Sequence, residues 1–200
     1  MRNAVLILAS AGAVVLLMLN KSGAVVSDGT EDESSGPTAG DDESNFIEDG
    51  ADSIMSVFSN WPSGSAPYQQ TITDAATQYG VPVSILAWLL WKESRYNPLI
   101  IDGTKRSRVG AMGIAQFMPA TAAQELGSEA AALDPSQAIP GAARYLAKLY
   151  SQAGTWQGAL AAYNWGIGNV LRRGLDAAPA ETTDYYTTIM SKAGLAGSYA

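Results

Sequence analysis

The spacing of apolar residues predicts an α-helical fold for most of the chain after residue 53. Ile72, Ala75 and Tyr79 lie three or four positions apart, which places them on one helical face, and Gly80 suits the end of that helix. Pro and Gly residues punctuate the later pattern in the same way. The further helices predicted by this pattern cover about 82–96, 119–126, 135–152 and 156–164, followed by two short helices, with an earlier helical spacing at 54–58.

The stretch 99–113 lacks this helical period. It contains Gly, Lys and Arg residues and no regular apolar spacing, which is typical of a loop or a short β-hairpin. The sequence therefore predicts one mainly α domain over 53–200, with a small loop or β-hairpin region inside it.

An uncharged apolar run covers residues 4–19, between Arg2 and Lys21. Its 16 residues are slightly short for a membrane-spanning helix of about 17–25 residues and slightly long for a signal-peptide core of about 7–15. We expect an N-terminal apolar helix within residues 1–24. It is a retained membrane anchor or a signal cleaved after residues 22–24, with a buried core helix as the third alternative. The first two alternatives place the rest of the chain outside the cytoplasm.

Residues 25–52 are rich in Ser, Gly, Asp and Glu, and we expect them to form a disordered acidic linker. Up to residue 52 the chain carries two basic and ten acidic residues, whereas 53–200 carries ten basic and nine acidic residues. The acidity of the chain therefore belongs to its N-terminal part. Neither part has a stripe of basic residues, so we expect no nucleic-acid partner.

The chain contains no cysteine and no histidine. The first absence excludes disulfides, thiolate metal sites and a cysteine nucleophile. The second excludes catalytic triads that use histidine and most transition-metal sites. We expect no metal and no cofactor, and any acid–base chemistry falls to Asp, Glu, Lys or Tyr.

Glu93 is the candidate catalytic acid. It follows the apolar residues 88–91 near the end of a predicted helix, and loss of hydration beside that surface would raise its pKa. A carboxylic acid with a raised pKa can protonate a glycosidic oxygen near neutral pH. The alternative from the residue alone is a solvated glutamate paired with Lys92 or Arg95.

Three sequence blocks set the context of Glu93. They are residues 93–98 (ESRYNP), 110–122 (GAMGIAQFMPATA) and 161–166 (AAYNWG). In this order they resemble the soluble lytic transglycosylase domain of the lysozyme-like superfamily, over about residues 68–190. The resemblance implies an α-rich, lysozyme-like fold.

The resemblance also implies the residues of the site. Glu93 matches the catalytic acid/base of the family, and the residues expected to bind substrate are Ser94, Gln116, Tyr163, Asn164 and Tyr185. The chain departs from the family pattern with Thr183 in place of an Arg two residues before Tyr185, and with Ala115 in place of a Met before Gln116. Gly110 and Gly113 are either turn residues or positions where the backbone approaches a sugar.

The resemblance implies a reaction with a single carboxylate. The glutamate protonates the β-1,4 bond after N-acetylmuramic acid, the N-acetyl group of the sugar stabilises the cationic centre, and the C6 hydroxyl closes a 1,6-anhydro ring. Hydrolytic glycosidases generally use two carboxylates, and here the next acidic residue after Glu93 is Asp102, with no other before Glu125. The alternatives are a hydrolytic muramidase that uses Asp102 or a positioned water, and a non-catalytic wall-binding or virion structural module.

The expected partners follow from this assignment. They are the glycan strands of peptidoglycan, the membrane through residues 4–19, and an envelope machine or a phage particle. We expect the catalytic domain to be membrane-anchored in the periplasm or cell envelope, exported after signal cleavage, or carried by a virion.

Overall fold

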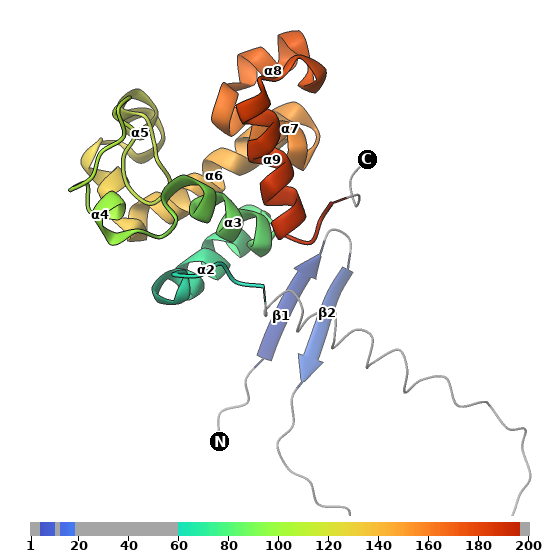
Figure 1. Ribbon diagram of the computed structural model, residues 1–200. Helices are drawn as coiled ribbons and strands as arrows, with labels where there is room; N and C mark the ends of the chain where they lie inside the picture. The colour runs from blue at the N-terminus through green and yellow to red at the C-terminus, as the bar shows by residue number, and fades with distance from the viewer. Residues whose placement is uncertain (1–4, 11–12, 19–59, 197–200) are drawn as a thin grey trace, which may run out of the picture. The chain divides into compact units, whose positions relative to one another are not determined.

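The structure is a computed structural model that describes residues 5–10, 13–18 and 60–196. The chain divides into two compact units, residues 1–50 and 51–200. The second unit is built from helices (Figure 1), which confirms the predicted mainly α domain. Its elements are η1 (Ala66–Tyr68), α2 (Gln69–Tyr79), α3 (Val83–Ser94), α4 (Pro98–Ile101), α5 (Pro119–Leu126), η2 (Ala130–Leu133), α6 (Pro135–Ala153), α7 (Trp156–Trp165), α8 (Ile167–Arg173), η3 (Leu175–Ala177) and α9 (Ala180–Lys192).

The helix ends follow local sequence chemistry. The side chain of Asp134 accepts a hydrogen bond from the backbone N–H of Ser136 at the start of α6. Thr155 caps α7 in the same manner through the N–H of Gly158. Both side chains satisfy N–H groups that a helix cannot satisfy internally. Gly80 ends α2 in the left-handed conformation, as its position in the sequence predicts.

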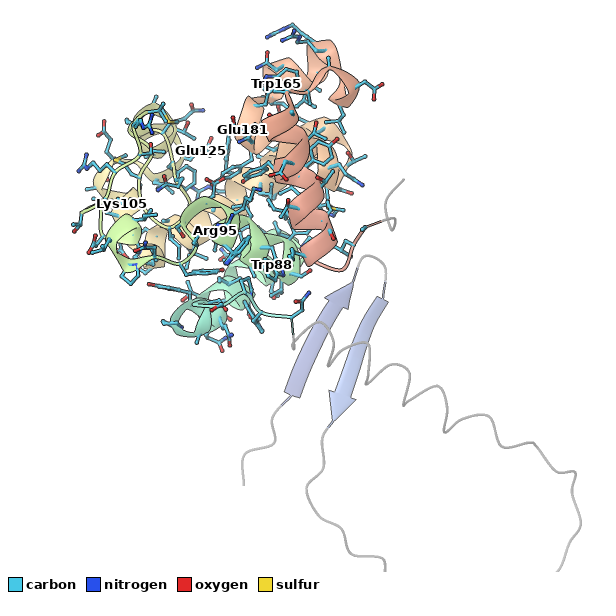
Figure 2. The ribbon with its side chains drawn as sticks, in the orientation of Figure 1. Trp88, Arg95, Lys105, Glu125, Trp165 and Glu181 are labelled. Carbon is cyan, nitrogen blue, oxygen red and sulfur yellow. The ribbon has the colours of Figure 1, made fainter. Side chains whose placement is uncertain are left out.

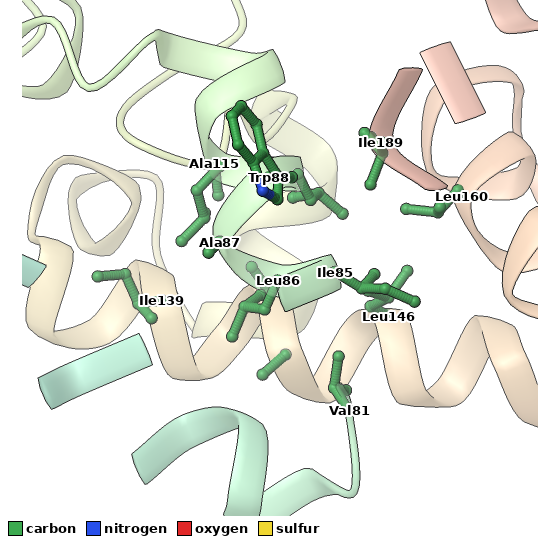
Figure 3. Close-up of a cluster of buried hydrophobic side chains, with 14 of the residues drawn as sticks. Val81, Ile85, Leu86, Ala87, Trp88, Ala115, Ile139, Leu146, Leu160 and Ile189 are labelled. Carbon is green, nitrogen blue, oxygen red and sulfur yellow. The ribbon is translucent and has the colours of Figure 1, made fainter. Parts of the chain in front are cut away.

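Helix α3 forms the centre of the second unit. Its residues Ile85, Leu86, Leu89 and Leu90 are fully buried, because α3 packs against both α2 and α9, while α6 contacts α2 and α7. Figure 3 shows the α3 side chains among apolar residues from α6, α7 and α9. The buried residues 85–90 of α3 are all apolar, so the polar side chains of this helix lie at its two ends.

The segment between α4 and α5 has little regular structure, in agreement with the predicted loop or hairpin. One antiparallel pair joins Met112 and Phe117, through hydrogen bonds of 3.0 and 3.1 Å. Gly113, inside this turn, has a φ of 73°, and a Cβ atom there would lie 1.7 Å from the carbonyl oxygen of Ala132. Glycine is therefore required by both conformation and space. The sequence pattern missed the short helix α4.

The N-terminal unit differs from the predicted helix. Strands β1 (Val5–Ser10) and β2 (Ala13–Met18) pair antiparallel, with Val5 opposite Met18 and Ser10 opposite Ala13. The prediction of an apolar helix over residues 4–19 is therefore wrong. A continuous apolar run does not distinguish strand from helix, and the Val and Ile residues of this run favour strands.

No helix within the described ranges combines the length and the apolar character needed to cross a membrane. The expected membrane anchor through residues 4–19 is thus not supported. The cleavage sequence at 22–24, the linker at 25–52 and the helical spacing at 54–58 lie outside the described residues.

Candidate active site

Glu93 lies in the last turn of α3, and its side chain is only partly accessible. Burial raises its pKa from 4.5 to about 7, against smaller opposing effects of a hydrogen bond from Tyr185 and the positive charge of Lys92. The solvated alternative fails, because Lys92 pairs with Asp184 and the guanidinium of Arg95 lies 3.5 Å from the centre of the Trp91 ring. Glu93 is therefore a carboxyl group that gains and loses its proton near neutral pH.

Tyr185 provides the direct partner of Glu93. It is buried on α9, and its hydroxyl donates a hydrogen bond to Oε1 of Glu93. Burial and the nearby charge of Glu93 raise the pKa of Tyr185 well above its usual value, so the hydroxyl stays protonated and remains a donor. One turn earlier on α9, Thr182 donates to Oδ1 of Asn164 at 2.7 Å, which ties α9 to α7.

Tyr163 reaches the site from α7. Its hydroxyl donates to the backbone carbonyl of Ala115 at 2.9 Å, and its ring packs against Phe117 and Tyr145. Burial, together with the charge of Glu93, raises the pKa of Tyr163 well above its usual value. Tyr163 therefore fixes the turn that follows Gly113 beside α7, in addition to any contact with substrate.

Gln116 occupies that turn in a strained conformation. Its φ is 47°, which is uncommon for a residue other than glycine, and its Nε2 donates to the carbonyl of Gly113 at 2.8 Å. Such strain persists only where the surroundings enforce it and often marks functional positions. Because Ala115 is bonded to Tyr163, the turn holds Gln116 next to the site residues of α7.

Ser94 and Asn164 differ in accessibility. Ser94 is buried; its hydroxyl donates to the carbonyl of Leu90 at 3.0 Å and accepts from the N–H of Tyr96 at 3.2 Å. It thus stabilises the turn after α3, where Arg95 and Tyr96 have positive φ values of 55° and 52°. Asn164 is exposed and accepts from Thr182.

Sequence reasoning gave no role in the site to Thr182 and Asp184, and it considered Lys92 only as a partner of Glu93. Lys92 Nζ lies 2.6 Å from Asp184 Oδ2, a link between α3 and α9. The sequence signal that could have identified Thr182 is its helical spacing from Tyr185, which puts the two residues on one face of α9. Figure 2 shows Arg95 near the middle of the domain, with Lys105 on the loop side and Glu181 on the side of α9.

The other acidic residues considered have separate partners. Asp102 is exposed and accepts from the N–H of Thr104 at 2.8 Å, and Glu125 pairs with Lys148 at 2.8 Å. Among the residues that the structure describes, no group of three or more acidic side chains could hold a metal ion. A cavity of about 250 Å³ lies elsewhere, lined by Glu125, Leu126, Gln137, Pro140, Gly141 and Arg144, and contains none of the expected site residues.

A helical domain in which a largely buried carboxyl group has a near-neutral pKa and is bonded to a tyrosine has the features of an acid–base enzyme site. Residues 70–185 match the model of the transglycosylase SLT domain, and the chain belongs to this family of enzymes. The family inferred from the sequence blocks is thereby confirmed.

One relative of known name is consistent with this family. A protein named "Transglycosylase" from Enterobacteria phage PRD1 is 38% identical over 104 residues, which cover 52% of this chain and 37% of the relative. The chain spans well under half the length of this relative.

Two solved structures share the fold. The first, an inactive Glu-to-Gln mutant of lytic transglycosylase Slt from Pseudomonas aeruginosa, has a TM-score of 0.55 and 28% identity over 66% of this chain and 24% of its own. The second, the 70 kDa soluble lytic transglycosylase SLT70 from Escherichia coli, has a TM-score of 0.52 and 27% identity over 62% of this chain and 23% of its own. The expected lysozyme-like fold is confirmed.

Proposed function

We propose that this chain is a lytic transglycosylase that cleaves the β-1,4 bond between N-acetylmuramic acid and N-acetylglucosamine in peptidoglycan. The observation that carries the proposal is the setting of Glu93, whose Oε1 accepts a hydrogen bond from the buried Tyr185 and whose burial raises its pKa to about 7. A group with this pKa is populated in both protonation states at neutral pH, as a residue that acts first as acid and then as base requires. Membership of the transglycosylase SLT domain family supports this substrate class.

The proposed reaction uses Glu93 twice. The protonated carboxyl group donates its proton to the glycosidic oxygen, and the C1–O bond breaks as N-acetylglucosamine leaves. The N-acetyl carbonyl of the muramic acid stabilises the positive centre at C1. The Glu93 carboxylate then removes the proton of the C6 hydroxyl, whose oxygen bonds to C1 and closes the 1,6-anhydro ring. Glu93 ends protonated, as it began, and no water is consumed.

Tyr185 supports the ionised state of Glu93. Its hydroxyl donates to Oε1, and a donated hydrogen bond stabilises the carboxylate that must exist between the two proton transfers. Gln116, Tyr163 and Asn164 are proposed to bind the sugars, with Tyr163 also holding the turn of Gln116 through Ala115. We assign Ser94 a positioning role, because its hydroxyl is engaged by the backbone.

A glutamate is also essential elsewhere in the family. The similar Pseudomonas aeruginosa enzyme is inactive as a Glu-to-Gln mutant. This supports a test in which Glu93 receives the same change.

A hydrolytic muramidase is the competing enzyme, and it needs a second carboxylate or a positioned water. Asp102 is exposed and bonded to the backbone of its own loop, and Glu125 is paired with Lys148. These observations favour the single-carboxylate reaction. The alternative without catalysis is a module that binds the cell wall and does not cleave it.

We further propose that the protein acts outside the cytoplasm or in a virion, since its substrate lies in the cell wall. The phage relative supports a virion or lysis context.

The product identifies the reaction. Purified peptidoglycan is incubated with the full chain, with Glu93→Gln, and with Glu181→Gln as a matched control, because Glu181 is an exposed glutamate at the start of α9. Mass spectrometry should detect anhydro-muropeptides, lighter by one water than hydrolysed fragments, from the wild type and Glu181→Gln only. Hydrated products would establish a muramidase. Wall binding by a folded chain without any product would establish the non-catalytic alternative.

A further inference from the structure

An ion pair connects the helix of Glu93 to the helix of Tyr185. Lys92 Nζ lies 2.6 Å from Asp184 Oδ2, with the Lys92 side chain 16% exposed and the Asp184 side chain 70% exposed. Helices α3 and α9 are packed together at this point (Figure 1). Lys92 and Asp184 directly precede Glu93 and Tyr185 in the sequence. The ion pair and the Tyr185–Glu93 hydrogen bond therefore join the same two helical turns.

We propose that Asp184 is a positioning residue that acts on Glu93 through Lys92, because its carboxylate holds and compensates the ammonium group beside the catalytic carboxyl. The inference rests on the proposed role of Glu93 as the acid/base. Asp184 itself touches no reacting atom. Its effect is to limit how strongly Lys92 favours the ionised form of Glu93.

The direction of this effect follows from the charges. The positive charge of Lys92 lowers the pKa of Glu93 and so opposes the effect of burial. Lys92 in turn lowers the pKa of Asp184, first through their hydrogen bond and then through its charge. Loss of the Asp184 charge would leave Lys92 uncompensated, and Glu93 would then release its proton at lower pH. Loss of Lys92 would have the opposite effect.

The other groups around Glu93 are neutral or have another contact, so the Lys92–Asp184 pair is the one whose charges can adjust the pKa of Glu93. Tyr163 on α7 and Tyr185 on α9 stay neutral, because the pKa of each is raised well above its usual value. The turn 111–117 contributes no charged residue. Arg95 also acts on Asp184 through its charge, but its guanidinium is stacked on Trp91.

The test measures the proton on Glu93 directly, in the full chain. Glutamate side-chain carboxyls are labelled with ¹³C and titrated by NMR, and the Glu93 signal is assigned as the one absent from Glu93→Gln. This readout requires no turnover. A failure of the proposed reaction is therefore distinguishable from a failure of the Lys92–Asp184 coupling.

Four proteins form a double-mutant cycle: the wild type, Asp184→Asn, Lys92→Gln, and the double variant. The titration midpoint of Glu93 should fall by roughly half a pH unit in Asp184→Asn and rise by a similar amount in Lys92→Gln, as expected for a partly solvated charge. In the double variant it should match Lys92→Gln alone, because Asp184 acts through Lys92. Lys148→Gln, which breaks the separate pair with Glu125, should leave the midpoint unchanged.

Two results would overturn the inference. One is an unchanged midpoint in Asp184→Asn. The other is an equal fall caused by Asp184→Asn with and without Lys92, since Asp184 would then act on Glu93 directly. In the active enzyme, the alkaline limb of the pH–rate profile should move by the same amounts, and a contact that merely stabilises the fold would not move it.

Discussion

The hydroxyl of Tyr185 donates its hydrogen bond to Oε1 of Glu93, although the two residues are 92 positions apart in the sequence. The bond exists because α9 packs against the end of α3. It lowers the pKa of Glu93, while burial raises that pKa more strongly, and the balance lies at about 7. The chemistry of the candidate acid therefore depends on a contact between distant parts of the chain.

Tyr185→Phe should raise the pKa of Glu93 further, because it removes the hydrogen bond and keeps the burial. A hydrogen bond to a charged group is worth about 1.5–3 kcal/mol, and about 1.4 kcal/mol corresponds to one pH unit. The alkaline limb of the pH–rate profile should move up by about one pH unit, and the maximal turnover on the acid side of that limb should fall because the Glu93 carboxylate is harder to form. Tyr186→Phe, at the neighbouring position of α9, is the control. An alkaline limb that stays in place would contradict this role of Tyr185.

Glu93 should also make stability depend on pH. Its pKa is about 7 in the folded chain against an ordinary 4.5, so the folded state binds the proton more tightly between these values. Stability should be highest below about pH 4.5 with respect to this group and should fall as the pH rises to 7, by about 3 kcal/mol. Glu93→Gln should remove that loss.

Urea unfolding at pH 5 and pH 8 measures this effect. The free energy of unfolding of Glu93→Gln should exceed that of the wild type at pH 8 and approach it at pH 5. The same difference between the two proteins at both pH values would show that Glu93 titrates normally. Using the difference between the proteins cancels the contributions of the other carboxyl groups.

Tyr163→Phe should loosen the turn that carries Gln116. The change leaves the carbonyl of Ala115 without its partner, which costs about 1–2 kcal/mol for a buried group. The amide of Phe117, bonded across the turn to Met112, should then exchange its hydrogen faster. Tyr145→Phe, in the same ring cluster, is the control. Unchanged exchange at Phe117 would show that the turn holds without Tyr163.

The sequence predicted the helical domain because its apolar spacing and capping residues act locally. Gly80 marks a helix end in the structure as the sequence predicts, and Asp134 and Thr155 cap the helices predicted to begin at residues 135 and 156. The N-terminal run had no such local signal. Its apolar residues do not by their spacing distinguish a strand from a helix, and the structure has a strand pair there.

The candidate site was predicted less completely. Glu93 was identified from its apolar neighbours and from the sequence blocks, but the commitment of Ser94 to the backbone was not foreseen. The Lys92–Asp184 pair was missed because the sequence offered Glu93 as the nearby partner of Lys92. The partner of a side chain depends on which helices pack together, and the spacing of residues along the sequence carries no information about that packing.

The domain boundary leads to a further prediction. A fragment of residues 53–200 should fold like the full chain, because it keeps Asn60, whose carbonyl accepts from Trp88 at 3.1 Å and whose amide donates to the carbonyl of Lys192 at 2.5 Å. A fragment that begins at residue 66 loses these bonds and the buried Ser65, and its melting temperature should be lower. Equal melting of the two fragments would show that residues 60–65 do not stabilise the domain.

Gly113→Ala should be among the most destabilising single-methyl changes in the domain. The residue has a φ of 73°, and the added Cβ would lie 1.7 Å from the carbonyl oxygen of Ala132, a backbone atom that cannot move aside alone. Gly127→Ala is the matched control, because its φ is 84° and no atom lies within 4 Å of the added carbon.

In the control Gly127→Ala, the free energy of unfolding should fall by about 1–2 kcal/mol, which is the cost of a left-handed backbone conformation in a residue with a side chain. In Gly113→Ala, the free energy of unfolding should fall by the same amount and by at least about 2 kcal/mol more. This variant should also release less product from peptidoglycan, because the turn of Gln116 must shift. Urea unfolding of both variants measures the difference. If the two lost equal stability, the close contact with Ala132 would have no energetic weight, and the glycine would serve only the turn conformation.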